Sequence, residues 1–339
     1  MEQFDWKNLP FGYVKTDYNV RFYCRNGKWG KMEISSSEFI IMHMASTCLH
    51  YGQEAFEGLK AYRGKDNRIR LFRWRDNAKR MRDTARGILM TEVPEEIFRD
   101  AVFTAVKLNE KYVPPYGYGA TLYIRPLLIG ISPEVGVKPA KDYLFMVFVT
   151  PVGPYFKNGF APVDILLCRN YDRAAPLGTG RYKVGGNYAA SLASLEWAHE
   201  MGYSTTLYLD PKEKKYIDEA GPANFFGIKN NTYITPDSTS ILPSITNMSL
   251  MEMSKTLGMK VEKRPVPLEE LCTFEEVGAC GTAAVITPIR KIYDPVENKT
   301  YEFCKDGKPG PISTKLYNWL TAIQTGDAED KFGWIDFVE

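Results

Sequence analysis

The sequence is poor in the features that mark a metalloprotein or a membrane protein. Its 339 residues include three histidines, at positions 43, 50 and 199, and no two have the spacing of metal ligands. The six cysteines form no Cys-x-x-Cys pair, so in a chain of this length we predict buried thiols. No apolar run approaches the ~20 residues that a membrane-spanning helix needs.

The chain also has little net charge. Its 43 basic and 41 acidic side chains nearly cancel, so the composition indicates neither a nucleic-acid partner nor an anionic membrane. The stretch MEQFDWKNLP has neither the apolar core of a signal peptide nor the Arg- and Ser-rich pattern of a transit peptide. We therefore expect a cytoplasmic protein.

The length of the chain predicts two domains, because one hydrophobic core rarely serves so many residues. The first half alternates apolar strand patterns with two helical patterns, at 75–90 and 94–113. The stretch PVGPYFKNGFAP then concentrates proline and glycine, which is typical of a linker. We predict an amino-terminal domain over 1–150, an interdomain loop over 151–162 and a carboxy-terminal domain over 163–339.

The second half has strand patterns, a hairpin and helices. Asn230-Asn231 separates two apolar runs and predicts a tight hairpin turn. Helical patterns cover 244–258 and 312–326.

The stretch RYKVGGNY, residues 181–188, places Lys183 before two glycines. A lysine amine attacks an aldehyde when desolvation or a nearby positive charge lowers its pKa. Glycines would let a flat ring lie close to the backbone. Taken alone, however, the stretch favours a solvated lysine beside a turn.

Several groups suited to anions and cations are spread along the chain. Glu219, at the end of a strand pattern, could fix a pyridinium proton if it lay buried beside a cation. Ser244 and Thr246 open a helix whose amino terminus could hold phosphate, and Thr282 lies in a Gly-Thr turn. Arg80 could add charge-assisted hydrogen bonds. Each also fits a simpler interpretation as a loop carboxylate, a helix cap, a turn residue or an exposed helix face.

Tyr123 and Arg125 share one face of an apolar strand, because side chains at i and i+2 point the same way. An arginine in so apolar a strand needs a partner. A substrate carboxylate or an internal acidic side chain would serve equally well.

Seven stretches in order resemble the fold-type IV, pyridoxal-phosphate-dependent aminotransferases, and most closely the branched-chain amino acid aminotransferases. The resemblance extends over nearly the whole chain. The seven stretches are LHYGQEAFEGLKAYRG, LFRWRDNAKRM, LYIRPLLIG, YKVGGNYAASL, YIDEAGPANFF, LPSITN and GTAAVITP. The resemblance implies a mixed α/β fold with a smaller amino-terminal domain and a larger carboxy-terminal domain built on a β-barrel-like core.

The resemblance also implies roles for individual residues. Lys183 matches the lysine that holds pyridoxal phosphate covalently and carries the proton, and Glu219 matches the carboxylate on the pyridine nitrogen. Tyr188 matches a neighbour of the phenolic oxygen. The residues that match the phosphate site are Arg80, Ile245, Thr246 and Thr282.

The substrate residues are implied in the same way. Tyr123, Arg125 and the backbone around Thr282 and Ala283 match the groups that face the substrate carboxylate. The residues that match the apolar side-chain pocket are Tyr51, Phe56, Tyr155 and Ala284, although packing in the core would explain any single aromatic equally well. Val137 lies on a loop that in the family reaches the partner subunit's site, which implies a homodimer.

The sequence departs from the family pattern at three positions. Ser244 stands where glycine is common, and Asn247 stands where arginine is common. Both positions belong to the expected phosphate site. Ala223 stands where some bacterial members have glutamate, which alters the expected polar network.

The predicted activity is exchange of amino groups between leucine, isoleucine or valine and 2-oxoglutarate by a ping-pong route. Two relatives of the same fold, the D-amino acid aminotransferases and the aminodeoxychorismate lyases, are the alternatives. A non-enzymatic protein that binds pyridoxal phosphate or another phosphate is the alternative from a different class, and it would not exchange amino groups.

Overall fold

The computed structural model describes residues 4–155 and 159–339, and it divides into two compact units. One unit comprises residues 1–157, 182–185 and 322–339, and the other comprises 158–181 and 186–321. Residues 156–158 of the predicted interdomain loop lie outside the described residues. The predicted domain boundaries stay a prediction.

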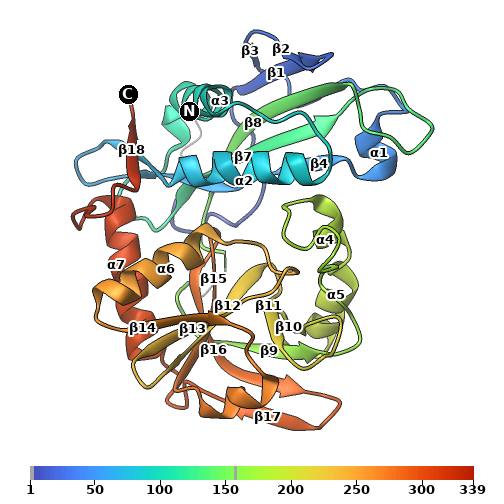
Figure 1. Ribbon diagram of the computed structural model, residues 1–339. Coiled ribbons are helices and arrows are strands. Elements are labelled where there is room, and N and C mark those ends of the chain that lie inside the picture. Colours follow the sequence, from blue (N-terminus) through green and yellow to red (C-terminus); the bar gives the residue numbers. More distant parts are fainter. Residues whose placement is uncertain (1–3, 156–158) are drawn as a thin grey trace. The chain divides into compact units, whose positions relative to one another are not determined.

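The first unit is built on a nine-stranded sheet with the strand order β18-β6-β5-β7-β8-β1-β2, in which β3 also pairs with β1 and β4 with β7. Figure 1 labels several of these strands, among them β1, β7, β8 and β18. Its elements are β1 (Asn19–Arg25), β2 (Lys28–Trp29), β3 (Glu33–Ser35), α1 (Thr47–Tyr51), β4 (Glu54–Phe56), β5 (Leu59–Arg63), β6 (Ile69–Phe72), α2 (Trp74–Gly87), α3 (Glu95–Leu108), η1 (Glu110–Tyr112), β7 (Thr121–Gly130), β8 (Asp142–Val152) and β18 (Ile335–Val338).

Helices α2 and α3 confirm the two helical patterns predicted for the first half. Helix α2 buries Trp74, Ala78, Met81 and Ala85, which recur at the three- or four-residue spacing of one helix face. Helix α3 begins after Pro94, has acidic residues in its first turn, and packs on β8 and β1. The two helices contact each other, and their apolar faces complete the core of the unit.

The second unit contains a closed β-barrel. Its strands follow one another in the order β11-β10-β9-β16-β15-β12, and β12 pairs back onto β11 to close the ring. Its elements are β9 (Val163–Cys168), α4 (Gly185–Ala189), α5 (Leu192–Glu200), β10 (Thr206–Leu209), β11 (Ile217–Ala220), β12 (Ala223–Lys229), β13 (Thr232–Pro236), α6 (Ile245–Thr256), β14 (Lys260–Arg264), η2 (Leu268–Thr273), β15 (Glu276–Gly281), β16 (Val285–Asp294), β17 (Lys299–Glu302) and α7 (Pro311–Thr325). The predicted barrel-like core is therefore confirmed.

Two further details of this unit follow from local sequence. Asn230 and Asn231 both have positive φ, at 48° and 54°, and connect β12 to β13 as the predicted hairpin turn. Helix α6 begins at the predicted place, where the Ser244 hydroxyl accepts the N–H of Asn247.

The cysteine prediction holds only in part. Cys24, Cys168 and Cys280 are buried, and Cys48 and Cys304 are half-buried. It is wrong for Cys272, which is exposed, because the short helix η2 lies at the surface and buries only Leu268 and Leu271.

Candidate active site

Lys183 is fixed by its backbone within the first unit. Its N–H donates to Thr84 Oγ1 at 3.1 Å, and its carbonyl accepts the N–H of Phe56 at 3.1 Å. Thr84 is buried in α2, and Phe56 ends β4. The Lys183 side chain is half-buried, with Nζ 4.7 Å from the centre of the Phe56 ring. The lysine is therefore not the freely solvated side chain that the isolated stretch suggested.

The glycine at 185 is explained by Glu54, which the sequence prediction missed. Glu54 Oε1 accepts the N–H of Gly185 at 2.5 Å, and a Cβ at 185 would lie 1.9 Å from that oxygen. Burial raises the pKa of Glu54, while the Gly185 N–H and Arg125 act in the opposite direction. Gly186 has no atom within 4 Å of an added Cβ.

Tyr123 and Arg125 lie on one face of β7, as their spacing predicted. The burial of β7 alternates, and the Arg125 Nη2 donates to Tyr123 Oη at 3.4 Å. The Arg125 guanidinium carbon lies 5.0 Å from the centre of the Phe56 ring. Arg125, Lys183 and Phe56 therefore belong to one cluster, with two cations around one aromatic ring.

Arg80 is engaged by an internal carboxylate. Its Nε and Nη2 each lie 2.7 Å from the oxygens of Glu57, a side chain that is completely buried. Asn77 also donates to Glu57, at 2.8 Å. The alternative of a solvated helix face is wrong for Arg80, because Glu57 needs a charged partner inside the protein.

Tyr51 and Val137 lie at the surface of the first unit. Val137 is 86% exposed, and the Tyr51 hydroxyl donates to the carbonyl of Val135 in the same loop. Tyr155 is partly exposed and packs edge-on against Phe11, with ring centres 5.1 Å apart.

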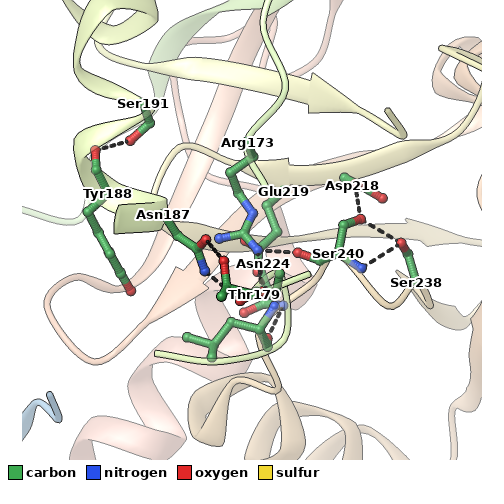
Figure 2. A network of polar contacts seen from close by, with 12 residues as sticks. Arg173, Thr179, Asn187, Tyr188, Ser191, Asp218, Glu219, Asn224, Ser238 and Ser240 are labelled. Carbon is green, nitrogen blue, oxygen red and sulfur yellow. Dashed lines mark hydrogen bonds and ion pairs between the residues drawn. The ribbon is translucent and has the colours of Figure 1, made fainter. Parts of the chain in front are cut away.

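Glu219 in the second unit is buried and paired with a cation. Its Oε2 lies 2.5 Å from Nε of Arg173, which is also buried, and its Oε1 accepts the Leu242 N–H at 3.0 Å (Figure 2). The interpretation of Glu219 as an exposed loop carboxylate is therefore wrong. The sequence prediction missed Arg173, although a buried acidic residue implies a cationic partner.

Helix α4 carries Asn187 and Tyr188, which follow the two glycines. The Asn187 amide donates to the Thr179 carbonyl at 2.7 Å and accepts the Thr179 hydroxyl at 2.8 Å (Figure 2). Tyr188 is half-buried, and its carbonyl accepts the Ser191 hydroxyl. The two Asn187 bonds join the residues on either side of Lys183 in the sequence.

The amino terminus of α6 presents Ile245 and Thr246, both buried. The first N–H groups of a helix have no acceptor in the helix's own ladder and suit an anion. Asn247, which departs from the family pattern, points its amide elsewhere: it accepts the Tyr233 hydroxyl at 2.7 Å and donates to Thr235 at 2.9 Å. Its side chain therefore joins the helix to β13.

Thr282, Ala283 and Ala284 form the half-buried turn that connects β15 to β16. Ala223 begins β12 beside the end of β15, because a Cβ added at Gly281, the last residue of β15, would lie 3.8 Å from the Ala223 Cβ.

No cluster of three His, Cys, Asp or Glu side chains suited to a metal occurs within residues 4–155 and 159–339. In the same described part of the chain, no helix is both long and apolar enough to cross a membrane.

A lysine on a glycine-rich loop, a buried charged carboxylate and a helix amino terminus for phosphate are the groups that a pyridoxal phosphate enzyme needs. The family model for amino-transferase class IV matches residues 54–292, and the chain belongs to this family.

The individual relatives have a narrower description than the family. The chain is 49% identical, over 100% of both sequences, to a branched-chain-amino-acid aminotransferase of Haemophilus influenzae. The structure resembles the branched-chain amino acid aminotransferase of Escherichia coli, with 27% identity, a TM-score of 0.78, and coverage of 96% of this chain and 100% of that one. It also resembles a T.th. branched-chain amino acid aminotransferase complexed with N-(5'-phosphopyridoxyl)-L-glutamate, with 25% identity, a TM-score of 0.77 and the same coverage.

Proposed function

We propose that this chain is a branched-chain amino acid aminotransferase that depends on pyridoxal phosphate. It transfers the amino group of leucine, isoleucine or valine to 2-oxoglutarate, by a ping-pong route, and yields the 2-oxo acids and L-glutamate. The full-length identity to the Haemophilus influenzae enzyme supports the substrate class, and the glutamate adduct in the T.th. enzyme supports the cofactor and the second substrate. The single structural observation that carries the proposal is the buried Glu219 carboxylate, which forms an ion pair with Arg173.

The donor set fits pyridoxal phosphate. The Lys183 amine suits the aldehyde, and the Glu219 carboxylate, kept ionised by Arg173, suits a protonated ring nitrogen. The residues proposed for the phosphate are Arg80, Ile245, Thr246 and Thr282. A guanidinium has five N–H donors, so Arg80 can serve Glu57 and a phosphate together.

When bound, the cofactor supplies an electron sink for the α-carbon of the substrate. Lys183 removes the α-proton at Nζ and returns it. The Phe56 and Thr84 bonds to the Lys183 backbone fix the start of that side chain, which limits where Nζ can move. Tyr188 is proposed to lie beside the phenolic oxygen.

Two sets of residues are proposed for the substrate. The set for the carboxylate combines the Arg125 cation, the Tyr123 hydroxyl and the turn between β15 and β16, including Thr282 and Ala283. Burial of a branched apolar chain discriminates by about 1–3 kcal/mol per methylene. The residues proposed for that pocket are Tyr51, Phe56, Tyr155 and Ala284.

A homodimer is also proposed, because the first unit exposes apolar side chains close to one another. Ile41, Met44, Val135 and Val137 are 83% or more exposed, and the Glu134 N–H donates to the carbonyl of Ala45, which joins the two segments that carry them. Exposed apolar patches of this kind mark interaction sites. Val137 is proposed to reach the partner subunit's site. A cytoplasmic location stays a prediction.

A test of the interface compares Ile41→Glu with Val296→Glu, since Val296 is exposed on the second unit. Sedimentation should show that Ile41→Glu weakens the dimer and that Val296→Glu does not. Equal dissociation constants for both variants and the wild type would contradict the proposed interface.

The function is tested by spectroscopy of the purified protein, which should be yellow. Leucine without an oxo acid should change the absorbance spectrum, and 2-oxoglutarate should restore it. A response to D-alanine but not to leucine would favour the D-amino acid aminotransferases, and a coloured protein that exchanges no amino group would favour the binding protein.

Borohydride reduction should fix the cofactor on the peptide that contains Lys183. Lys183→Ala should lose roughly a thousandfold or more in amino transfer, because it removes both the nucleophile and the base. Lys79→Ala is the control, since Lys79 is exposed on α2. Label on another lysine would refute the assignment.

A further inference from the structure

Arg173 connects three segments of the second unit. Its Nε lies 2.5 Å from Glu219 Oε2, at the end of β11. Its Nη2 donates to the Gly180 carbonyl at 2.8 Å and also to the Ser240 carbonyl. Figure 2 shows the Arg173 guanidinium beside Glu219. A planar guanidinium has several donors in fixed directions, so one side chain can set the relative positions of all three.

The segment that contains Ser240 is itself held on both sides. The Ser240 hydroxyl donates to the buried carboxylate of Asp218, the residue before Glu219, and bonds to the Ser238 hydroxyl at 2.6 Å (Figure 2). Two residues later, the Leu242 N–H donates to Glu219. The segment therefore contacts Arg173 with a carbonyl and Glu219 with an amide.

The contact at Gly180 leads toward the reacting lysine. Gly180 precedes Lys183 by three residues in the sequence, and a Cβ at 180 would lie 2.6 Å from the Ser240 Cα. Only glycine allows this approach, because the backbone atom that a Cβ would meet cannot move aside as a side-chain end can. Arg173 therefore holds the beginning of the lysine loop and the Glu219 carboxylate with one rigid group.

We propose that Arg173 is a positioning residue for the amino transfer, acting through Glu219. This inference rests on the proposed function, since it assumes that Glu219 faces the ring nitrogen of pyridoxal phosphate. Arg173 keeps the buried carboxylate ionised and fixes its orientation. A buried carboxylate that lost its cation would favour its neutral form and would hold a protonated ring nitrogen poorly.

The test uses two probes, pyridoxal phosphate and its 1-deaza analogue, in which a carbon replaces the ring nitrogen. Arg173→Gln should raise the Kd for pyridoxal phosphate by ~10- to 100-fold, the range for a lost charge-assisted hydrogen bond. Its Kd for the analogue should change much less than its Kd for pyridoxal phosphate, because the analogue has no ring nitrogen for Glu219 to hold and only the looser lysine loop affects it. Arg173→Lys should recover part of the lost affinity for pyridoxal phosphate, since it restores the positive charge but not the several fixed N–H donors of the guanidinium.

A matched control is available in the same unit. Arg169 forms an ion pair at 2.6 Å with Asp294, which is fully buried. Arg169→Gln should lower the denaturation midpoint but leave both Kd values unchanged.

A double mutant separates positioning from folding. In the Glu219→Gln background, adding Arg173→Gln should weaken pyridoxal phosphate by less than threefold, because the two residues act as one unit. Equal weakening of both probes by Arg173→Gln, or additive losses in the double mutant, would overturn the proposal. If Arg173→Gln does not fold, the Kd values of Arg173→Lys for the two probes are compared instead, and equal weakening of both would overturn the proposal. Failure of the wild type to bind pyridoxal phosphate would refute the proposed function instead.

Discussion

The contact between Gly185 and Glu54 predicts a large difference between two adjacent glycines. An alanine Cβ at 185 would lie 1.9 Å from Glu54 Oε1, whereas at Gly186 it would meet no atom within 4 Å. The carboxylate can avoid the clash only by leaving the Gly185 N–H, which it now accepts at 2.5 Å. Both substitutions add one methyl group, so their sizes are matched.

The expected magnitudes follow from these contacts. Gly185→Ala should lower the free energy of unfolding by ~1–3 kcal/mol, the cost of a lost hydrogen bond to a charged group in a partly buried place. Gly186→Ala should raise it by ~0.5–1 kcal/mol, because alanine loses less backbone entropy than glycine in a helix. Urea unfolding followed by circular dichroism measures both values.

A double mutant tests the cause of the loss at 185. In a Glu54→Ala background the clash is absent, so Gly185→Ala should then lower the free energy of unfolding by less than ~0.5 kcal/mol. Amino transfer should fall in Gly185→Ala more than in Gly186→Ala, because Gly185 lies two residues after Lys183. Equal stabilities of the two alanine variants, or an unchanged cost without Glu54, would refute this reasoning.

Two further predictions concern stability. The buried Glu276 carboxylate accepts the N–H and hydroxyl of Ser313 in the first turn of α7, so Glu276→Gln should lower the free energy of unfolding by ~1–3 kcal/mol, and an unchanged urea midpoint would contradict this. The hydrogen bond from Arg70 lowers the pKa of Asp66 to about 2. A carboxylate with a lowered pKa adds stability above its unfolded-state pKa and loses it as the pH falls through the folded-state value. Asp66→Asn should therefore destabilise the protein near neutral pH, and most of this difference from the wild type should be lost as the pH falls to ~2. If a series of urea titrations gave the same difference in free energy of unfolding between the wild type and Asp66→Asn at every pH, the predicted role of the Arg70–Asp66 pair would be contradicted.

The parts of the fold that depend on local sequence could be predicted. The hairpin at Asn230-Asn231 requires positive φ, which asparagine tolerates, and the apolar spacing in α2 specifies one buried face. Closure of the barrel could not be predicted from patterns, because β9 pairs with β16 and β12 returns to β11 through contacts between distant segments. Nothing in a strand pattern identifies its neighbour.

The same division applies to the site. The family motifs predicted roles for Lys183 and Glu219. The residues that contact them, Thr84 and Arg173, were missed because both lie outside the seven motif stretches. The signal for Glu57 was present, since an acidic residue among apolar neighbours must have a cation. Reading that signal would have shown that Arg80 already has an internal partner.

The pairing of β18 with β6 has a consequence during synthesis. Strand β18, residues 335–338, pairs with β6, residues 69–72. One edge of β6 therefore stays unpaired until the ribosome has made the entire barrel. An open edge strand is a template for pairing with another nascent chain. Deleting β18 should therefore reduce the yield of soluble protein from cells even where the barrel folds normally.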